Sequence, residues 1–310
     1  MAGLAECVPN VSVGREPAVL DLLERSVTDS GAALLDTHSD PDHNRSVLTL
    51  AGGLADIRRA VLALARVAVR AIDLRRHAGA HPRVGVLDVV PIVPLDGTDL
   101  SACVGEAHTL GQRIWEQFSV PVYLYGRAAS QPSRERLEAV RRFGFERLSQ
   151  MVGEGKMLPD IGGPTLHESA GACFVGVRDI MVALNVALGG CSVAVAKRVA
   201  GQVRERGGGL PGVKALGLYL ESAGEVQVSM NVTKPCATPI GTVIDVVRER
   251  AVSMGATFLH AELVGLAPRA ALGPDPAALG IRGYGPAMVL ENRLAGLCGP
   301  PDSGRRCRPR

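Results

Sequence analysis

The sequence predicts an α+β fold built from two consecutive β-α-β-β-α-β units, each an antiparallel sheet covered by helices. The same order of predicted elements occurs over residues 1–93 and again over 180–264, although the two stretches share no obvious identity. The chain has 310 residues, 46% of them hydrophobic, which is enough for two modest cores. We expect an N-terminal domain over 1–178, a C-terminal domain over 179–298 and a disordered tail over 299–310.

Apolar spacing defines the elements of the first unit. A helix over 54–74 is clearly amphipathic, because Ile57, Val61 and Leu64 recur at helical spacing. The unit is predicted to contain a strand over 1–9, a helix over 17–28, strands over 32–37 and 45–51, the helix over 54–74 and a strand over 84–93. A polar loop over 38–44 joins the two middle strands.

A connecting segment precedes the second unit. It contains predicted helices over 101–117 and 133–142, a strand over 120–125 and an irregular loop over 158–171, whose length is typical of a functional loop. The second unit is predicted to contain strands over 180–188, 213–220, 225–232 and 256–264 and helices over 192–206 and 239–254. Thr238 is the expected cap of the last helix, with Pro239 at its first position.

Composition and charge exclude several classes of protein. A net charge of +3 and an aromatic content of 3% argue against a nucleic-acid-binding surface. Charges interrupt the apolar runs before they reach the length of a membrane span, and residues 1–10 do not resemble a signal peptide. The 7 cysteines show no CxxC spacing and are typical of a reducing compartment. We therefore expect a cytoplasmic protein that binds a small anionic ligand.

Residues 76–88 place two histidines and two arginines directly before an apolar strand. Proline after His81 favours an extended backbone, which argues against a helix carrying His77 and His81 as paired metal ligands. Imidazole and guanidinium groups in such a loop are suited to proton transfer and anion binding. The alternative interpretation is an ordinary solvated basic turn.

Potential metal ligands are adjacent in the earlier polar loop: Asp36, His38, Asp40, Asp42 and His43. Arg45 would repel a cation there, so we expect no metal and expect Asp36 or Asp40 to orient a histidine or an arginine. The sequence contains no Walker loop, GxGxxG, HExxH or GxSxG motif, so nucleotide, zinc-protease and serine-hydrolase functions lack their usual support.

Ordered motifs extend along much of the chain: ECVPN (6–10), DHNRSV (42–47), RHAGAHPRVG (76–85) and VPVYLYG (120–126). Together they resemble the formiminotransferase domain of formimidoyltransferase-cyclodeaminase and the stand-alone bacterial glutamate formimidoyltransferases. The resemblance continues through Pro159-Asp160, 162–171, Asn231 and 262–266, and so covers about residues 3–295. Since the chain ends before a cyclodeaminase domain could begin, we expect transferase activity alone.

This resemblance implies two ferredoxin-like (βαββαβ) subdomains, a folate tunnel between them and a homodimer. The implied reaction moves a formimino group between N-formimino-L-glutamate and N5 of tetrahydrofolate, in histidine degradation, with tetrahydrofolate as co-substrate. His81 matches the family's catalytic histidine before Pro-Arg and is the expected general acid/base. His77 either supports His81 or closes the turn.

The binding residues that the resemblance implies fall into two groups. Those expected at the substrate are Asn10, His38, Asp40, Asn44, Arg45, Arg76 and Arg83. Those expected at folate are Gly162, Gly163, Pro164, Thr165, Leu166, His167, Glu168, Ser169, Ala170 and Gly171. The arginines are candidates for carboxylate binding, with structural ion pairs as the alternative, and either asparagine alternatively caps a turn.

Departures from the family pattern bear on which substrate the protein uses more than on the type of reaction. His38 stands where some members carry an aspartate, Gly163 is an additional glycine, and Ala170 stands where an aromatic residue can occur. Competing hypotheses are transfer of a formyl or formimidoyl group to or from another amine, a folate-binding protein without catalysis, and a metal-dependent amidohydrolase.

Overall fold

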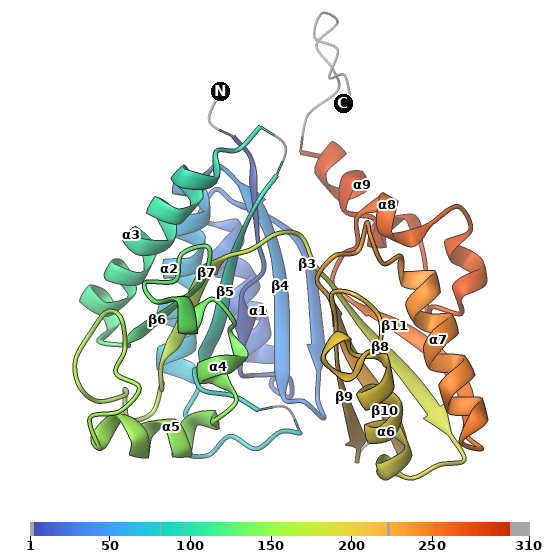
Figure 1. The fold of residues 1–310 in the computed structure, drawn as a ribbon. Helices are drawn as coiled ribbons and strands as arrows, with labels where there is room; N and C mark the ends of the chain where they lie inside the picture. Colours follow the sequence, from blue (N-terminus) through green and yellow to red (C-terminus); the bar gives the residue numbers. More distant parts are fainter. Residues whose placement is uncertain (1–2, 81, 96, 222–223, 298–310) are drawn as a thin grey trace, which may run out of the picture. The chain divides into compact units, whose positions relative to one another are not determined.

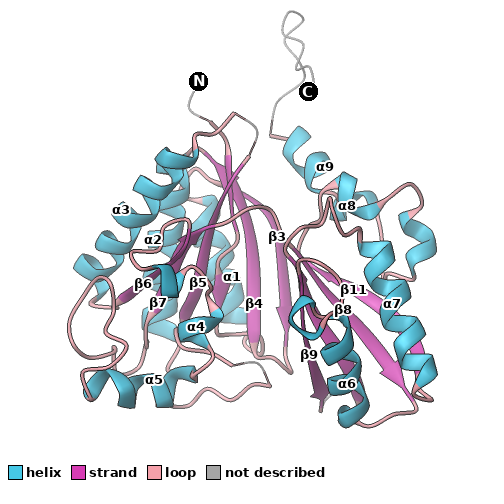
Figure 2. Ribbon diagram, in the orientation of Figure 1, coloured by secondary structure: helices cyan, strands magenta, loops and turns pink. Residues whose placement is uncertain are grey.

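The computed structural model describes residues 3–80, 82–95, 97–221 and 224–297. The described chain forms two compact units: one runs to Ile180 and includes Leu218–Val226, and the other contains Met181–Gly217 and the chain from Gln227 onward. Each unit combines helices with a sheet, which confirms the predicted α+β class (Figures 1 and 2).

The sheet of the first unit is mostly antiparallel. Its strands are β1 (Ala5–Cys7), β2 (Asn10–Val11), β3 (Ala33–Asp40), β4 (Arg45–Gly52), β5 (Leu87–Pro94), β6 (Val122–Gly126) and β7 (Cys173–Val177). β1 and β2 share one position between β4 and β5, and β3 pairs with β4. β7 pairs in parallel with both β5 and β6, which extends the sheet.

Helices cover both faces of the extended part of this sheet. α1 (Pro17–Thr28), α2 (Leu54–Ala71) and α3 (Leu100–Phe118) form one core with apolar side chains such as Leu124. Tyr123 belongs to a second core with Leu148, built by α4 (Glu138–Arg141) and α5 (Gly144–Gly153). Because neighbouring strand residues point to opposite faces, these cores lie on opposite sides of the sheet. Such double coverage is typical of parallel strands.

Strand register brings the polar residues of the first unit together. Asp40 pairs with Arg45, and both His38 and Asn10 pair with Val47. The register between β2 and β5 shifts around Asp88, which is an extra residue in β5. Bulges of this kind commonly re-aim a side chain.

The second unit has a separate sheet with the order β11-β8-β10-β9. Its strands are β8 (Val182–Gly189), β9 (Val213–Leu220), β10 (Glu225–Val232) and β11 (Thr257–Val264). α6 (Val193–Val203) and α7 (Ile240–Ser253) pack against each other, and α7 contacts β8 and β11. After β11 come two short helices and turns of 3-10 helix: α8 (Arg269–Leu272), Pro276–Leu279, Pro286–Met288 and α9 (Leu290–Ala295).

Several predicted boundaries are wrong. The strand predicted over 1–9 is confirmed only as β1, and β2 begins after it, at Asn10. β3 continues through His38 to Asp40, so the polar loop is shorter. The helix over 192–206 ends at Val203 and is followed by a 3-10 turn, Glu205–Gly207. Thr238 does not cap α7, since its hydroxyl donates instead to the Pro211 carbonyl at 2.8 Å.

The connecting segment differs most from the prediction. The helix over 133–142 is a 3-10 turn, Pro132–Arg134, followed by the short α4. Neither α5 nor β7 is predicted by the sequence pattern. The predicted disordered tail over 299–310 lies outside the described residues.

Candidate active site

The loop that precedes β5 is seated on the turn between β3 and β4. His77 Nε2 lies 2.8 Å from the Asn44 carbonyl oxygen, and Asn44 Nδ2 donates to the Ala78 carbonyl at 3.1 Å. The Ala80 amide donates to the Asp42 backbone carbonyl at 2.9 Å. Gly79 makes this approach possible, because a Cβ there would lie 2.3 Å from the His43 carbonyl oxygen. The loop and the turn therefore form one structural element.

Asp40 and Asn44 shape that turn. Asp40 Oδ1 accepts hydrogen bonds from the Asp42 and His43 amides at 2.8 and 2.9 Å, and its Oδ2 lies 3.2 Å from His43 Nδ1. Asn44 has a left-handed backbone with φ 47°, and its Oδ1 accepts from the Gly14 amide at 2.9 Å. Asparagine tolerates this conformation better than most residues.

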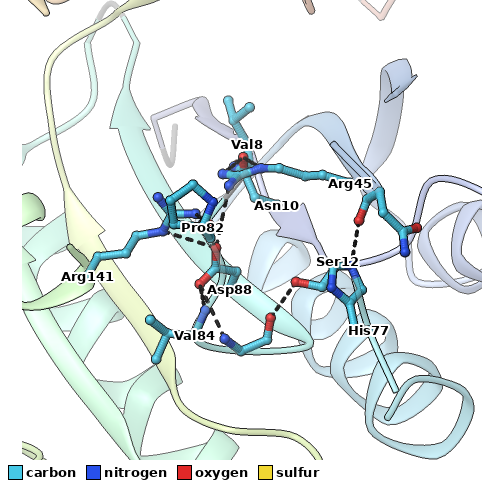
Figure 3. Close-up of polar contacts among 11 residues, drawn as sticks. Val8, Asn10, Ser12, Arg45, His77, Pro82, Val84, Asp88 and Arg141 are labelled. Atoms are coloured by element: carbon cyan, nitrogen blue, oxygen red, sulfur yellow. Dashed lines mark hydrogen bonds and ion pairs between the residues drawn. The ribbon is translucent and has the colours of Figure 1, made fainter. Parts of the chain in front are cut away.

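Asp88 is the buried centre of a polar cluster (Figure 3). Its Oδ1 accepts from the backbone amides of Val84 and Gly85 at 3.1 and 3.3 Å. Its Oδ2 accepts from Arg141 Nε at 3.0 Å and Nη2 at 2.6 Å, and lies 3.5 Å from Arg45 Nη1. One carboxylate thus holds the start of β5 and bridges two guanidinium groups.

Arg45 connects this cluster to β2. Its Nε and Nη2 donate to Asn10 Oδ1, the Nε at 3.0 Å, and Asn10 Nδ2 donates to the Val8 carbonyl at 2.8 Å. Burial, followed by the nearby Arg141 charge, lowers the pKa of Arg45 to about 9, while Asp88 opposes the shift. Arg45 therefore remains cationic at neutral pH.

The other predicted arginines have different surroundings. Arg83 forms a two-pronged ion pair with Glu146 and also donates to the Leu74 and His77 carbonyls at 3.0 and 3.3 Å. Arg76 is exposed, and its backbone amide donates to the Asp73 carbonyl. The structure therefore places Arg45 in the Asp88 cluster and Arg83 in a separate ion pair.

His77 has a defined tautomer. A carbonyl oxygen only accepts, so the neutral ring carries its proton on Nε2, and Nδ1 is buried without a hydrogen-bond partner among the described residues. Burial lowers the pKa of His77, although the bond to Asn44 partly opposes the shift. The neutral ring donates to the Asn44 carbonyl and so connects its loop to the β3–β4 turn.

Residue 81 lies outside the described residues, so the structure does not test the expectation for His81. Backbone contacts hold the described residues on either side of it. The Ala80 amide donates to the Asp42 backbone carbonyl, and the Pro82 carbonyl accepts from Arg141 Nη2 at 2.6 Å. Arg141 therefore links this loop directly to Asp88.

The C-terminal part of the predicted folate segment lies beside the same loop. Three backbone amides donate to backbone carbonyls across this contact: Leu74 to Ser169 at 2.9 Å, Val86 to Ala170 at 3.0 Å, and Ala172 to Val84 at 3.1 Å. Gly171 has φ 71°, and a Cβ there would lie 1.9 Å from the Val84 carbonyl oxygen. The segment can follow this path only with glycine at position 171.

The remainder of that segment is held by other contacts. Gly162, with φ 112°, packs against Trp115 and Pro121. His167 Nδ1 accepts from the Ser169 and Ala170 amides at 3.3 and 3.0 Å, and burial lowers the pKa of this ring. The other predicted members are mostly exposed or half-buried: Gly163, Pro164, Thr165, Leu166 and Glu168.

Sequence reasoning missed Asp88 and Arg141. Asp88 is the acidic residue within the otherwise apolar run VGVLDVV, which was a usable signal. Arg141 lies on a short helix among several other arginines, and nothing in its local sequence distinguishes it.

The described part of the chain has no group of three or more His, Cys, Asp or Glu side chains placed to hold a metal ion. Nor does any described helix combine the length and apolar character needed to cross a bilayer.

Comparison with known proteins identifies the family. The formiminotransferase domain, N-terminal subdomain, matches residues 4–178, and the formiminotransferase domain matches residues 183–275. The glutamate formimidoyltransferase of Thermoplasma acidophilum is 38% identical, covering 94% of this chain and 97% of that protein. Its namesake from Streptococcus pyogenes serotype M1 is 36% identical, with coverages of 88% and 91%.

A longer relative matches over part of its length. The formimidoyltransferase-cyclodeaminase of Rattus norvegicus is 37% identical over 88% of this chain, which spans 51% of the rat protein. The matched domains and the nearly full-length relatives agree with each other. The chain belongs to the formiminotransferase family.

Proposed function

We propose that this protein transfers a formimino group from N-formimino-L-glutamate to N5 of tetrahydrofolate. The observation that carries the proposal is the match over nearly the whole length of a relative named glutamate formimidoyltransferase. Contacts that join the polar loop, the Asp88 cluster and the 162–171 segment support it, because they bring the candidate imidazole, guanidinium and folate-binding groups into one unit.

The reaction requires proton transfer. The folate N5 attacks the formimino carbon and loses its proton as a tetrahedral intermediate forms. The C–N bond to glutamate then breaks, and the glutamate nitrogen gains a proton and leaves as an amine. His81 in the His-Pro-Arg motif is the proposed general acid/base, a role typically worth ~100- to 10,000-fold in rate. His77 is proposed to position the loop through its bond to Asn44.

The binding roles are assigned as follows. Substrate binding is proposed for Asn10, His38, Asp40, Asn44 and Arg45, and Arg76 is proposed to meet a folate or glutamate carboxylate from the surface. The segment 162–171 is proposed to bind folate. Arg83 is proposed to be a structural ion pair, because Glu146 and two backbone carbonyls already bind its guanidinium.

The subdomain topology, the oligomeric state and the cellular location are also proposals. Ferredoxin-like subdomains are supported by the order β5-β1/β2-β4-β3 in the first sheet and β11-β8-β10-β9 in the second. In both sheets the fourth, first, third and second strands of the unit follow one another. The domain limits at 178 and 298 and the cytoplasmic location rest on the sequence pattern and composition. The folate tunnel, the homodimer and the place in histidine degradation rest on the family resemblance.

The test is the transfer reaction with purified protein. Wild type is expected to convert tetrahydrofolate and formiminoglutamate to 5-formimidoyltetrahydrofolate, whereas His81→Ala retains folate binding and loses most turnover. A wild-type protein that binds folate but transfers no group to or from glutamate would overturn the proposal.

A further inference from the structure

A buried ion pair holds the chain just before the segment 162–171. Arg134 Nη1 lies 2.6 Å from Asp160 Oδ2, and only 9% and 4% of these two side chains are exposed. Arg134 Nη2 also donates to the Leu158 carbonyl at 2.6 Å. The Leu124 amide of β6 donates to the same carboxylate oxygen of Asp160 at 2.9 Å. The pair therefore joins this part of the chain to β6 and to the 3-10 turn that ends at Arg134.

Other hydrogen bonds join the same stretch to β6. The Asp160 and Ile161 amides both donate to the Val122 carbonyl, at 3.0 and 3.1 Å, and the Val122 amide donates back to the Ile161 carbonyl at 2.9 Å. The Tyr123 hydroxyl donates to the Met157 carbonyl at 2.7 Å. The chain therefore enters the following segment from a fixed point beside the sheet.

The segment 162–171 is fixed mainly at its ends. At its C-terminal end, Gly171 leaves no room for a side chain, because a Cβ there would lie 1.9 Å from the Val84 carbonyl oxygen. Every residue over 162–169 is exposed or half-buried. A loop that buries little apolar surface does not hold one conformation by itself. The position of the segment therefore depends on the contacts at its two ends.

The Arg134–Asp160 pair is suited to hold one of these ends. Hydrogen bonds between ionised groups are roughly twice as strong as those between neutral groups. Removing one partner of a buried pair also leaves the other charge uncompensated, which favours conformations in which that charge reaches water. A ligand that binds only one conformation loses affinity in proportion to the fraction of molecules that have left it. Loss of the pair should therefore weaken a ligand bound by the segment, although neither residue belongs to the segment.

We propose that Asp160 and Arg134 are positioning residues for folate: their ion pair holds the segment 162–171 in the conformation that binds tetrahydrofolate. The inference rests on the proposed function, in which this segment binds folate. It adds two residues that act through the segment and assigns a role in binding to an ion pair outside the polar loop and the Asp88 cluster.

Trp115 provides a reporter of the segment's position. It is the only tryptophan of the chain. A Cβ at Gly162 would lie 2.9 Å from its Cε3 atom, and a Cβ at Gly163 would lie 3.5 Å from its Cη2 atom. The indole ring therefore lies against the start of the segment. Displacement of the segment should make Trp115 fluorescence more accessible to a neutral quencher such as acrylamide.

The test compares Asp160→Asn with a matched control, Glu106→Gln. Asp160→Asn keeps an oxygen that can accept from the Leu124 amide and removes the charge that pairs with Arg134. Glu106 is also buried, and both of its oxygens accept from Arg58 Nη1, at 3.0 and 2.7 Å, but this pair joins α2 to α3 instead of holding the segment. Urea denaturation of both variants measures how much stability each one loses.

Asp160→Asn is expected to raise the Kd and the KM for tetrahydrofolate by about 10- to 100-fold. Acrylamide quenching of Trp115 should increase in the protein without folate. By contrast, kcat at saturating tetrahydrofolate and the KM for formiminoglutamate should stay near their wild-type values. Glu106→Gln should leave the quenching and all of these constants unchanged, even where it loses as much stability as Asp160→Asn.

Tyr123→Phe takes the place of Asp160→Asn if that variant does not fold. It removes only the hydroxyl that donates to the Met157 carbonyl and keeps the ring. The Kd for tetrahydrofolate and the quenching of Trp115 should change in the same direction, the Kd by about 2- to 10-fold, since a neutral hydrogen bond is lost.

Three results would overturn the inference: an unchanged affinity for tetrahydrofolate, an equal rise in KM for both substrates, or the same loss of affinity in Glu106→Gln. A loss of affinity with unchanged quenching would also overturn it, because Asp160 would then act without moving the segment. Binding is measured without the donor, so it does not depend on turnover. A wild-type protein that binds tetrahydrofolate but transfers no group would contradict the proposed function and leave the binding comparison intact.

Discussion

Arg83 and Glu146 form a two-pronged ion pair, with Nη1 3.0 Å from Oε2 and Nη2 2.8 Å from Oε1. The two partners differ in exposure: 18% of the Arg83 side chain is exposed and 70% of that of Glu146. Arg83 also bonds to the Leu74 and His77 carbonyls, whereas its partner lies at the surface. Most of the stabilisation is therefore expected to come from the backbone contacts of Arg83.

Arg83→Gln should destabilise the fold more than Glu146→Gln does. The arginine variant loses bonds to two carbonyls and is expected to lower the free energy of unfolding by about 1–3 kcal/mol. The glutamate variant loses an exposed ion pair, worth less than about 1 kcal/mol. Urea denaturation of both variants measures this difference. If Arg83→Gln instead raised KM for formiminoglutamate without changing stability, Arg83 would be a substrate-binding residue.

His77 should make stability depend on pH. Burial lowers its pKa in the folded protein, so the unfolded ring, with a pKa of about 6.5, takes up a proton more readily. The contribution of His77 is therefore complete above that value and declines as the pH falls through it. The difference in unfolding free energy between wild type and His77→Gln should shrink between about pH 7.5 and pH 5. A difference that stays constant or grows would contradict the buried neutral ring.

Elements with a regular apolar pattern were predictable from sequence, and the others were not. α2 carries a continuous amphipathic stripe, and its start at Leu54 is confirmed. β7 is fully buried, so CFVGV has no alternation of polar and apolar residues to reveal a strand. α5 was not predicted: it begins at Gly144 with φ 68°, separated from the end of α4 by two residues, and glycine with such a backbone is not a typical helix start.

The candidate site was predictable where its residues are close in sequence. The loop over 76–83 can be recognised in the sequence by its histidines and arginines. The sequence pattern did not, however, distinguish the role of Arg45 from that of Arg83. That separation depends on Asp88 and Glu146, which reach them only in the folded chain. Arg141 could not be predicted at all, because its partners lie 53 and 59 residues away along the sequence.

Asn44 should tolerate glycine better than alanine. Alanine loses the side-chain bonds to Gly14 and Ala78 and keeps a Cβ on a left-handed backbone, which costs about 1–2 kcal/mol. Glycine loses the same bonds without that strain. Urea denaturation should therefore rank Asn44→Gly above Asn44→Ala by about 1 kcal/mol. The reverse order would show that Asn44 does not adopt this conformation.

Gly79→Ala should impair turnover more than stability. The added Cβ would lie 2.3 Å from the His43 carbonyl oxygen, so the loop over 76–80 must move away from the β3–β4 turn. Because a displacement of about 1 Å can cost ~100-fold in rate, we expect a loss of that order in kcat/KM. Gly105→Ala is the matched control: Gly105 lies in α3, and its Cβ would meet no atom within 4 Å. The control should keep wild-type activity and gain up to about 1 kcal/mol of stability from helix propensity. Wild-type turnover by Gly79→Ala would show that close seating of the loop on the turn is unnecessary for catalysis, and the role proposed for His77 and Asn44 would fail with it.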